Sequence, residues 1–397
     1  MKQKNNNYHN ILWIPSAVPF FLFGFMYYLI MPYFAFNFLE EFSVVKTAEK
    51  FIQSSYFDYR YIIDCILILF FWIFGYIIVP KANSRVRLLD KFSNFKSAPI
   101  ILGSLFFTFL FFIIVSSAMS GSLFFSGYSS YDVSVLGQLS TLVLMSVWFI
   151  IYFQNKKIFF LFSIIFIVSS IILLGFGARM FFILGAISLG LLYLSKNKKR
   201  LISPSFVLSL FSLGIFIVWI GVWRSNMELS SDALVFIFLA EPLFTATSGA
   251  LYIDNIGGRP FFAFPTDIFA SVINFVPTVI FPDKVNVLNS ITFNEFKSSP
   301  FGASSIIVNM YSNFGIFFPI YFLLMGSFYG FLRKMAKSSI FFRAVYFTLL
   351  PVLMFHFFRE GFITVFKVIF FNGFILPAVT IFFLYLLFHR KIRVYNS

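Results

Sequence analysis

The chain has few charged residues, three histidines and one cysteine. Only 11% of its 397 residues are charged and 60% are hydrophobic, whereas soluble domains have about 25% charged and about 45–50% apolar residues. This composition excludes a soluble enzyme. The single cysteine, Cys65, excludes a disulfide framework and a cysteine-based metal site. We therefore predict an all-α, polytopic membrane protein, and the positions of its few charges become the main source of functional information.

Common catalytic motifs are missing as well. The sequence contains no Walker loop, no HExxH, no GxSxG and no paired CxxC. His9 and His389 lie in the terminal tails, so histidine-based hydrolysis would depend on His356 alone. We expect neither a metal nor another cofactor.

Apolar runs of about 20 residues, the length that crosses a bilayer as a helix, occur ten times. The first run follows Lys2 and Lys4 but is longer than the core of a signal peptide, so we expect it to be retained as a span. The predicted spans lie near residues 11–36, 61–79, 100–120, 134–153, 158–175, 180–195, 204–223, 304–332, 341–358 and 362–388.

The basic residues predict the orientation of these spans. One set of connectors, together with both tails and Arg343, holds 20 of the 30 Lys and Arg residues and a single acid, Asp90. By the positive-inside rule this set is cytoplasmic. It carries +19, whereas the rest of the chain carries −4. The net charge of +15 is therefore mainly a topology signal and does not indicate a nucleic-acid partner. The connectors in this set are 80–99, 154–157, 196–203 and 333–340.

The region 224–303 permits two interpretations. Its stretches 233–253 and 261–281 are each apolar enough to span, which would give twelve spans with the same cytoplasmic termini. Both contain proline and polar residues, among them Glu241, and broken polar helices are tolerated only inside protein or beside a wet cavity. We prefer one integral membrane domain, 1–397, in which 224–303 is an extracytoplasmic loop region with membrane-dipping segments.

Arginine on the predicted outer side is the most informative feature. Arginine costs about 2.5–3.5 kcal/mol at mid-bilayer, and its planar fork binds phosphate bidentately. Arg179 follows Gly177 and Ala178 in a predicted turn, before a short helix expected at 181–194. That helix would span roughly 21 Å, so the turn should lie below the outer headgroups. The alternative for Arg179 is an ordinary snorkelling residue at the interface.

The segment 355–362 is the second candidate. His356 and Arg359 are three residues apart, Glu360 follows directly, and Lys367 lies seven residues later in an apolar run. Ionisable residues at a membrane boundary indicate a functional site. The alternative is an internal ion pair of Glu360 with Lys367 or Arg359 that holds the two helices together.

Further candidates have structural explanations of equal weight. Arg224 follows a tryptophan at a span border, and Arg259 lies in a glycine-rich loop. Glu241 is either a base or the partner of a helix bend. Asn309 and Asn313 are able to bond sugar hydroxyls or neighbouring helices.

The pattern resembles that of the Wzy-type O-antigen polymerases, which join oligosaccharide repeat units in bacterial envelopes. The resemblance covers most of the chain through its hydropathy: ten or more spans, a large loop in the second half and cytoplasmic termini. Three local motifs carry the resemblance: Gly177-Ala178-Arg179, the stretch from Pro300-Phe301-Gly302 to Asn313-Phe314-Gly315, and Phe358-Arg359-Glu360-Gly361. In the first motif, Ala178 stands where the family usually has serine.

The resemblance implies a GT-C-like membrane fold in the bacterial inner membrane, with its active site facing the periplasm. It implies that undecaprenyl-pyrophosphate-linked oligosaccharides are both donor and acceptor, without a metal, and a chain-length regulator is a candidate protein partner. Arginines would then stabilise the departing pyrophosphate, and a positioned base would activate the acceptor hydroxyl. We assign Arg179 and Arg359 to the first role, with Arg224, Arg259, Lys367, Asn309 and Asn313 as substrate-binding residues. Glu360, Glu241 and His356 are the candidate bases of a direct, inverting displacement.

Three other functions remain open. An O-antigen ligase performs the same chemistry on another acceptor and usually relies on a periplasmic histidine, for which His356 is available. A metal-using GT-C glycosyltransferase would need acids in its first outer loop, where Glu40 and Glu41 lie. A flippase for lipid-linked oligosaccharides would carry charges along a path through the bundle, and the spans before Arg179 hold almost none apart from Asp64.

Overall fold

The regular structure described for this chain is entirely helical. The computed structural model describes residues 13–52, 56–80, 90, 93, 98–119, 133–153, 155–176, 178–196, 215, 230–276, 281–291 and 304–395. Within them, eight helices are long and apolar enough to cross a membrane, and 136–152 and 340–354 form shorter apolar helices. The prediction of an all-α, multi-pass membrane protein is thus confirmed. The eight are Val18–Phe38, Tyr59–Ile78, Ala98–Ser116, Lys156–Gly175, Arg179–Lys196, Ser231–Asn255, Ile306–Ala336 and Phe362–Leu384.

Short polar side chains begin several of the helices. Asp58 accepts a hydrogen bond from the Tyr61 amide and so caps α4 (Tyr59–Ile78). Serines act in the same way at the starts of α11 (Ser231–Asn255), α14 (Ile306–Phe314) and α16 (Ile340–Leu349). Such caps satisfy backbone amides that have no partner inside the helix.

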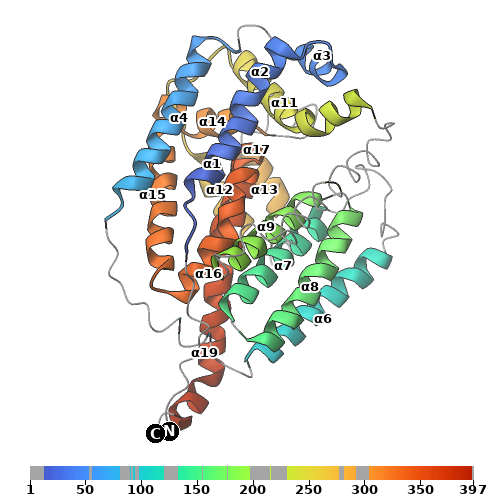
Figure 1. The fold of residues 1–397 in the computed structure, drawn as a ribbon, viewed down its shortest axis with the longest axis vertical. Coiled ribbons are helices and arrows are strands. Elements are labelled where there is room, and N and C mark those ends of the chain that lie inside the picture. The colour runs from blue at the N-terminus through green and yellow to red at the C-terminus, as the bar shows by residue number, and fades with distance from the viewer. Residues whose placement is uncertain are drawn as a thin grey trace.

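The first span is built from three segments that continue one another. These are α1 (Val18–Phe25), the π-helical turn η2 (Met26–Ile30) and α2 (Met31–Phe38), and they lead into the short helix α3 (Ser43–Glu49). A π-helical turn within an α-helix frequently marks a functional position. In Figure 1 this span lies beside α4, and α2 and α3 reach the upper end of the bundle.

The tightest helix pair joins α4 to α15 (Phe318–Ala336), which continues α14 through the turn η7 (Gly315–Phe317). A Cβ atom added at Gly326 would collide with the Trp72 carbonyl oxygen, and one at Gly330 would lie 2.5 Å from the Tyr76 carbonyl oxygen. The glycine pair 326–330 thus brings the two backbones together, as small residues do between membrane helices.

A second group of helices consists of α6 (Ala98–Met119), α7 (Val133–Tyr152), α8 (Lys156–Gly175) and α9 (Arg179–Lys196). In Figure 1 these helices lie together at the lower right. Buried helix α16 and the 3₁₀ segment η8 (Leu350–Met354) lie between the two groups.

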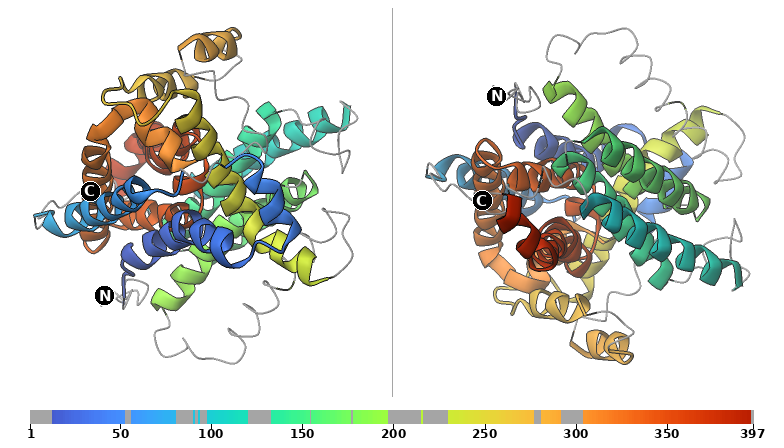
Figure 2. Two further views of the ribbon diagram at one scale, coloured as in Figure 1. Left: turned by 90° about the horizontal axis from the view of Figure 1, so that it is seen from above. Right: turned by 90° about the horizontal axis from the view of Figure 1, so that it is seen from below.

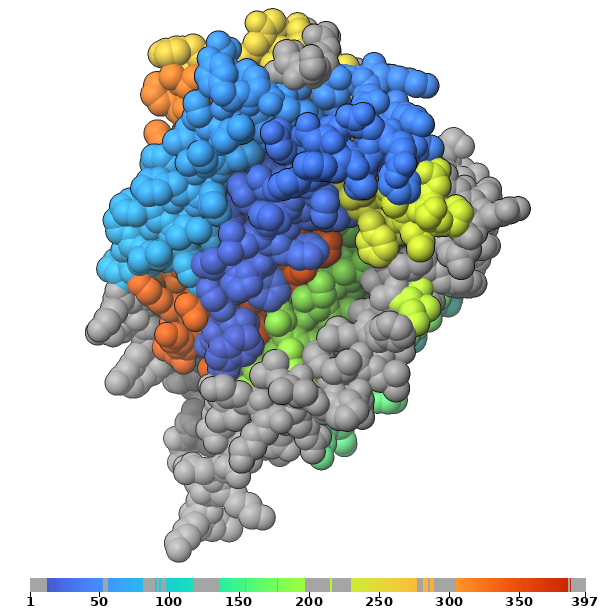
Figure 3. Space-filling model, turned by 45° about the horizontal axis from the view of Figure 1, so that its top comes forward, coloured from blue at the N-terminus to red at the C-terminus, as the bar shows by residue number. Residues whose placement is uncertain are grey.

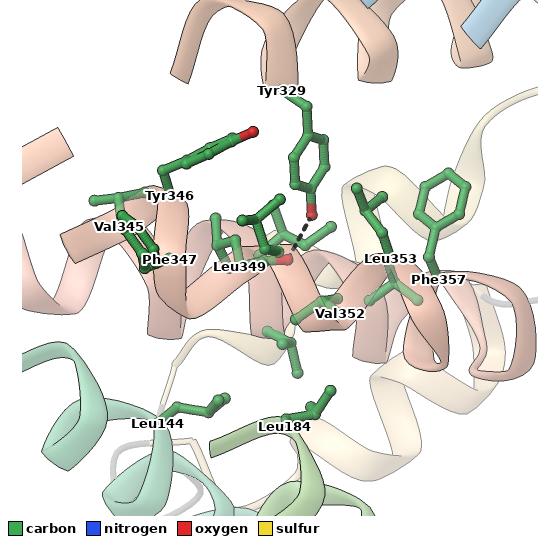
Figure 4. Close-up of a cluster of buried hydrophobic side chains, with 14 of the residues drawn as sticks. Leu144, Leu184, Tyr329, Val345, Tyr346, Phe347, Leu349, Val352, Leu353 and Phe357 are labelled. Carbon is green, nitrogen blue, oxygen red and sulfur yellow. Dashed lines mark hydrogen bonds between the residues drawn. The ribbon is translucent and has the colours of Figure 1, made fainter. Parts of the chain in front are cut away.

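The packing around α16 and η8 joins the two groups of helices. In Figure 4, Leu144 of α7 and Leu184 of α9 point toward the α16–η8 segment from one side, and Tyr329 of α15 approaches from the other. The Tyr329 hydroxyl donates a hydrogen bond to the Leu349 carbonyl at 3.2 Å. Burial of this segment positions the short helix that follows it, which carries the candidate site.

The two apolar stretches of the loop region 224–303 form helices of very different length. Residues 231–255 form one 25-residue helix, α11, with Pro242 in its interior. By length and composition α11 qualifies as a span, yet it lies across the upper end of the bundle, where Figure 2 shows its length from above. The stretch 261–281 contains α12 (Thr266–Asn274), whose nine residues cover only about 14 Å. The predicted span 204–223 lies outside the described residues, apart from Ile215.

The C-terminal part returns through the centre of the molecule. After η8 it comprises the short helix α17 (His356–Arg359), then α18 (Phe362–Phe366), the π-helical segment η9 (Lys367–Ile375) and α19 (Leu376–Tyr395). The short helix α13 (Lys284–Ile291) comes earlier in the chain and lies at the edge of the molecule in Figure 2. The end of α19 extends beyond the rest of the bundle in Figure 1.

Replacing Gly326 with valine should destabilise the protein, because the added side chain meets the α4 backbone and cannot be relieved by a rotamer change. We expect a loss of about 1–3 kcal/mol, measured as a lower midpoint of thermal unfolding in detergent. Gly190→Val is the matched control, since a Cβ atom at Gly190 has nothing within 4 Å. Equal midpoints for the two variants would contradict the close α4–α15 packing.

Candidate functional site

Four segments that are distant in the sequence bring charged and phenolic side chains together below α11. Arg359 of α17 pairs with Glu241 of α11, with 2.8 Å between Nη1 and Oε1. The Glu360 carboxylate lies 3.8 Å from the same guanidinium nitrogen. We call the following set the Arg359 cluster: Tyr27 and Tyr28 of η2, Arg179 of α9, Glu241 of α11, and His356, Arg359 and Glu360 of α17 and its C-terminal end.

Asn309 holds the backbone of this segment in place. Its side-chain amide donates to the Glu360 carbonyl at 2.8 Å, and its Oδ1 accepts from the Phe362 amide at 3.1 Å. The Ser304 amide donates to the Arg359 carbonyl at 3.0 Å. Asn309 therefore bonds the backbone on both sides of Gly361 and so positions Arg359 and Glu360.

Arg179 reaches the cluster from the second group of helices. It is the first residue of α9, so the helix expected at 181–194 is confirmed but has 18 residues where 14 were predicted. Phe181, two residues later, packs edge-on against the His356 ring with 4.8 Å between centroids. Tyr27 interacts electrostatically with Glu241, Arg179 and Arg359. Arg179 and Arg359, which lie 180 positions apart in sequence, are thus both close to Tyr27.

The surroundings of the cluster are visible on the molecular surface. In Figure 3, orange-red atoms of the C-terminal third appear between dark-blue α1 and green α9, beneath yellow-green α11. The same three helices supply Arg179 and Glu241 and adjoin the tyrosines of η2. The cluster therefore lies where the two groups of helices meet.

Several buried polar atoms in the cluster lack a hydrogen bond to the described chain. They are Nε of Arg359, Oε1 of Glu241, Nδ1 of His356 and the hydroxyl oxygen of Tyr28. The Arg359–Glu241 contact is close, yet it is not aligned as a hydrogen bond at Oε1. Buried polar groups are normally satisfied, so these atoms offer both donors and acceptors to a ligand.

Burial and neighbouring carboxylates have opposite effects on the pKa of the basic groups in the cluster. Burial lowers the pKa of His356, so the imidazole is neutral at pH 7. Burial also disfavours the charged form of Arg359, but Glu241 and Glu360 outweigh it and raise its pKa. The cluster therefore presents a permanent cation beside a neutral imidazole and two acids.

Arg259 belongs to a different network. It pairs with Asp64 at 3.0 Å and with Asp58 at 3.4 Å, and the Tyr311 hydroxyl donates to Asp64 at 2.7 Å. Burial opposes the charged form of Arg259, yet Asp64 outweighs it and raises the pKa. Its guanidinium is thus engaged with two carboxylates, so the expected supporting role of Arg259 in binding substrate is not supported by its geometry.

The other predicted binding residues also lie apart from the cluster. Asn313 exchanges two hydrogen bonds with Asp267, at 3.0 and 2.9 Å, and burial raises the pKa of that carboxyl. Lys367 has no carboxylate within 4.0 Å among the described residues, so the alternative of a Glu360–Lys367 ion pair is wrong, whereas Glu360 does lie beside Arg359. Arg224 lies outside the described residues.

Tyr27 and Tyr28 of η2 are members of the cluster that the sequence did not predict. Tyr27 donates a hydrogen bond to the Phe238 carbonyl at 2.6 Å, three residues before Glu241. Adjacent tyrosines within an apolar span are a usable signal, because a phenol buried there needs a polar partner. Their nearness to Glu241 depends on how α11 folds back, which no local pattern encodes.

No family model, no curated protein and no solved structure matches the chain. Within the described residues, no group of three or more His, Cys, Asp and Glu side chains is arranged to hold a metal ion. The functional argument therefore depends on the residues of the Arg359 cluster.

Replacing Glu241 with glutamine should destabilise the protein, because it leaves the Arg359 cation without its nearest carboxylate. We expect a loss of about 1–3 kcal/mol, and a smaller than additive effect in the double variant Glu241→Gln, Arg359→Gln. Thermal unfolding in detergent measures both. Asp254→Asn, at an exposed position of the same helix, is the control and should be neutral. Additive effects of the two single changes would show that the pair is not coupled.

The lowered pKa of His356 predicts a dependence of stability on pH. The unfolded chain binds a proton near pH 6.5, whereas the folded protein does so only at lower pH. Folded stability is therefore complete above about pH 6.5 and falls with decreasing pH, by up to about 1.4 kcal/mol per unit. His356→Gln should flatten this part of the profile, as measured by unfolding midpoints between pH 7.5 and 5. An unchanged slope in the variant would assign the acid sensitivity to other groups.

Proposed function

We propose that this protein polymerises undecaprenyl-pyrophosphate-linked oligosaccharide repeat units, transferring the glycan from one lipid carrier onto the next repeat unit. The observation that supports it most strongly is the convergence of Arg179, Arg359, Glu241, Glu360 and His356 from three separate elements. These are the five residues that the sequence pattern predicts to be catalytic. The resemblance to Wzy-type polymerases supplies the substrate class.

By the positive-inside rule we assign this end of the bundle to the non-cytoplasmic side, which is the periplasmic side if the membrane is the bacterial inner membrane that the resemblance implies. Both termini are then cytoplasmic. Lipid pyrophosphate lies at the membrane surface, and the cluster lies below α11, which extends across this end of the bundle. A lipid-linked donor would therefore reach the arginines from the bilayer while its sugars remain outside.

In the proposed reaction the arginines act on the leaving group. Cleavage of the glycosidic bond releases undecaprenyl pyrophosphate and increases the negative charge on its oxygens. Arg359 and Arg179 approach from different helices, so they are able to bind these oxygens from two sides. Preorganised charge of this kind is usually the largest single contribution to catalysis, and we infer that the reaction needs no metal.

The acceptor hydroxyl needs a base. Glu360 is the best candidate of the three, because its carboxylate lies 3.8 Å from Arg359 Nη1, whereas Glu241 is held at 2.8 Å. The Glu360 side chain is also more exposed, 30% against 17% for Glu241. We assign proton transfer to Glu360 and the positioning of Arg359 to Glu241, in one direct displacement that inverts the anomeric carbon.

The strongest alternative is an O-antigen ligase that transfers the same donor glycan onto lipid A core. His356 favours it, since this histidine belongs to the Arg359 cluster and its buried Nδ1 has no hydrogen-bond partner in the described chain. His356→Gln separates the two. A polymerase that uses Glu360 should retain most of its activity, whereas a histidine-dependent ligase should lose about 10²-fold or more.

Replacing Arg179 or Arg359 with alanine should abolish long polysaccharide chains while the protein stays inserted. Each loss removes charge stabilisation worth roughly 10²–10³ in rate, and lysine at either position should restore only part of it because it lacks the bidentate fork. Gel analysis of surface polysaccharide, in cells that supply the lipid-linked repeat unit, measures chain length. A flippase would instead cause these units to accumulate inside the cell.

Arg60→Ala is the matched control, since Arg60 is an exposed arginine near the same end whose guanidinium contacts the Tyr59 ring and hydroxyl. It should leave the ladder unchanged. Full ladders from both Arg179→Ala and Arg359→Ala would reject the assignment of the arginines to the leaving group.

A further inference from the structure

A second group of cations lies outside the Arg359 cluster. Lys367 begins η9, seven residues after Glu360, and is half-buried. Lys284 begins α13 and is 92% buried, with 8% of its surface exposed. These two lysines interact electrostatically and repel each other, although 83 residues separate them in sequence.

The geometry of the surrounding turn brings the two lysines together. Lys284 Nζ donates to the Val276 carbonyl at 3.0 Å and lies 3.5 Å from the Asn274 carbonyl. Phe275, between these two residues, stacks on Phe371 with 5.2 Å between centroids. Phe371 lies one helical turn after Lys367, so the 274–276 turn faces the side of η9 that carries Lys367.

The third wall is provided by α7. A Cβ atom at Gly137 would lie 3.6 Å from Lys367 Nζ, so α7 passes close to the ammonium group. One helical turn later in α7, the Thr141 hydroxyl donates a hydrogen bond to Asn372 Oδ1 at 3.3 Å and so joins α7 to η9. The charged group of Lys367 therefore lies beside α7, at a position where α7 carries no side chain.

Neither lysine is neutralised by the described part of the chain. No carboxylate of a described residue lies within 4.0 Å of either Nζ, although Asp283 adjoins Lys284 in sequence. Two like charges brought together without a counterion cost free energy. An anionic ligand that bridges them would recover this cost and accept hydrogen bonds from both ammonium groups.

We propose that Lys284 and Lys367 form a second anion-binding site, which takes the pyrophosphate of the acceptor lipid. This inference rests on the proposed function, because only a reaction between two lipid-linked substrates needs two pyrophosphate sites in one protein. The Arg359 cluster holds the donor, whose pyrophosphate departs. The lysines hold the acceptor, whose pyrophosphate is retained, and point charges suffice there because no charge develops on it.

The two sites are adjacent but distinct. Glu360 follows the end of α17 in an extended conformation, and Lys367 comes seven residues later, after α18. Different elements supply them: α9, α11 and α17 for the donor, α13 and η9 for the acceptor. Each site is thus open to separate mutation.

Binding of geranylgeranyl pyrophosphate to the full chain in phosphatidylcholine nanodiscs tests the proposal without requiring activity. The wild-type protein should bind two equivalents, and the neutral alcohol geranylgeraniol none. The variant Lys284→Gln, Lys367→Gln should lose one equivalent, or bind it about tenfold or more weakly, while keeping the other. Lys284→Arg, Lys367→Arg should restore it, and Lys50→Gln, at an exposed position of the chain, should keep both.

If the double variant aggregates, Lys367→Gln alone carries the same expectation, because this side chain makes no hydrogen bond within the described residues. Retention of two full-affinity equivalents by the lysine variant would overturn the site. Displacement of the lysine-dependent equivalent by phosphatidylglycerol added to the nanodiscs would assign it to a lipid headgroup and overturn the acceptor assignment.

Polymer synthesis separates this inference from the function on which it rests. If Arg359→Ala loses polymerisation and the lysine variant polymerises with an unchanged requirement for acceptor concentration, the inference fails and the function stands. If Arg359→Ala still polymerises while the lysine variant loses an equivalent, the anion site stands and the proposed catalytic role fails. Loss of polymerisation in the lysine variant, with one equivalent missing, supports both.

Discussion

The structure depends on keeping a guanidinium charged within a membrane protein. Arg359 lies on a four-residue helix whose position is fixed by the buried α16–η8 segment before it and by Asn309 beside it. Its counterion, Glu241, comes from α11, more than 100 residues earlier. Because an unpaired cation is expensive at membrane depth, this contact holds α11 across the end of the bundle and joins the N-terminal span, α9 and α17 around one site.

Hydropathy predicted most of the fold, since length and apolarity are local properties. Eight candidate helices were found among the described residues, and most of the expected spans coincide with them within a few residues. The π-helical segments η2 and η9 and the broken helix at α16, η8 and α17 were not anticipated, because burial on both sides decides them. The position of α11 was also uncertain from sequence, because a helix that contains Glu241 and Pro242 is compatible both with a membrane span and with a helix at the surface of the membrane.

The charged residues of the site were predictable as well, because a charged side chain in an apolar membrane chain is costly and therefore indicates a functional site. Arg179, Glu241, His356, Arg359 and Glu360 are all predictable on this ground. The same reasoning also predicts Arg259, which pairs with Asp58 and Asp64. The sequence does not show which arginines form ion pairs in the fold. This reasoning missed Tyr27, Tyr28 and Lys284, whose importance depends on tertiary neighbours.

The central claim is that the Arg359 cluster transfers glycans between lipid carriers. It is tested most directly with the purified protein in liposomes that contain a lipid-linked repeat unit, by measuring product length and released undecaprenyl pyrophosphate together. The account predicts a ladder of oligomers with one pyrophosphate lipid released per linkage, and neither product from the Arg359→Ala protein. Movement of intact lipid-linked units across the bilayer, with no new linkage and no released carrier, would contradict it.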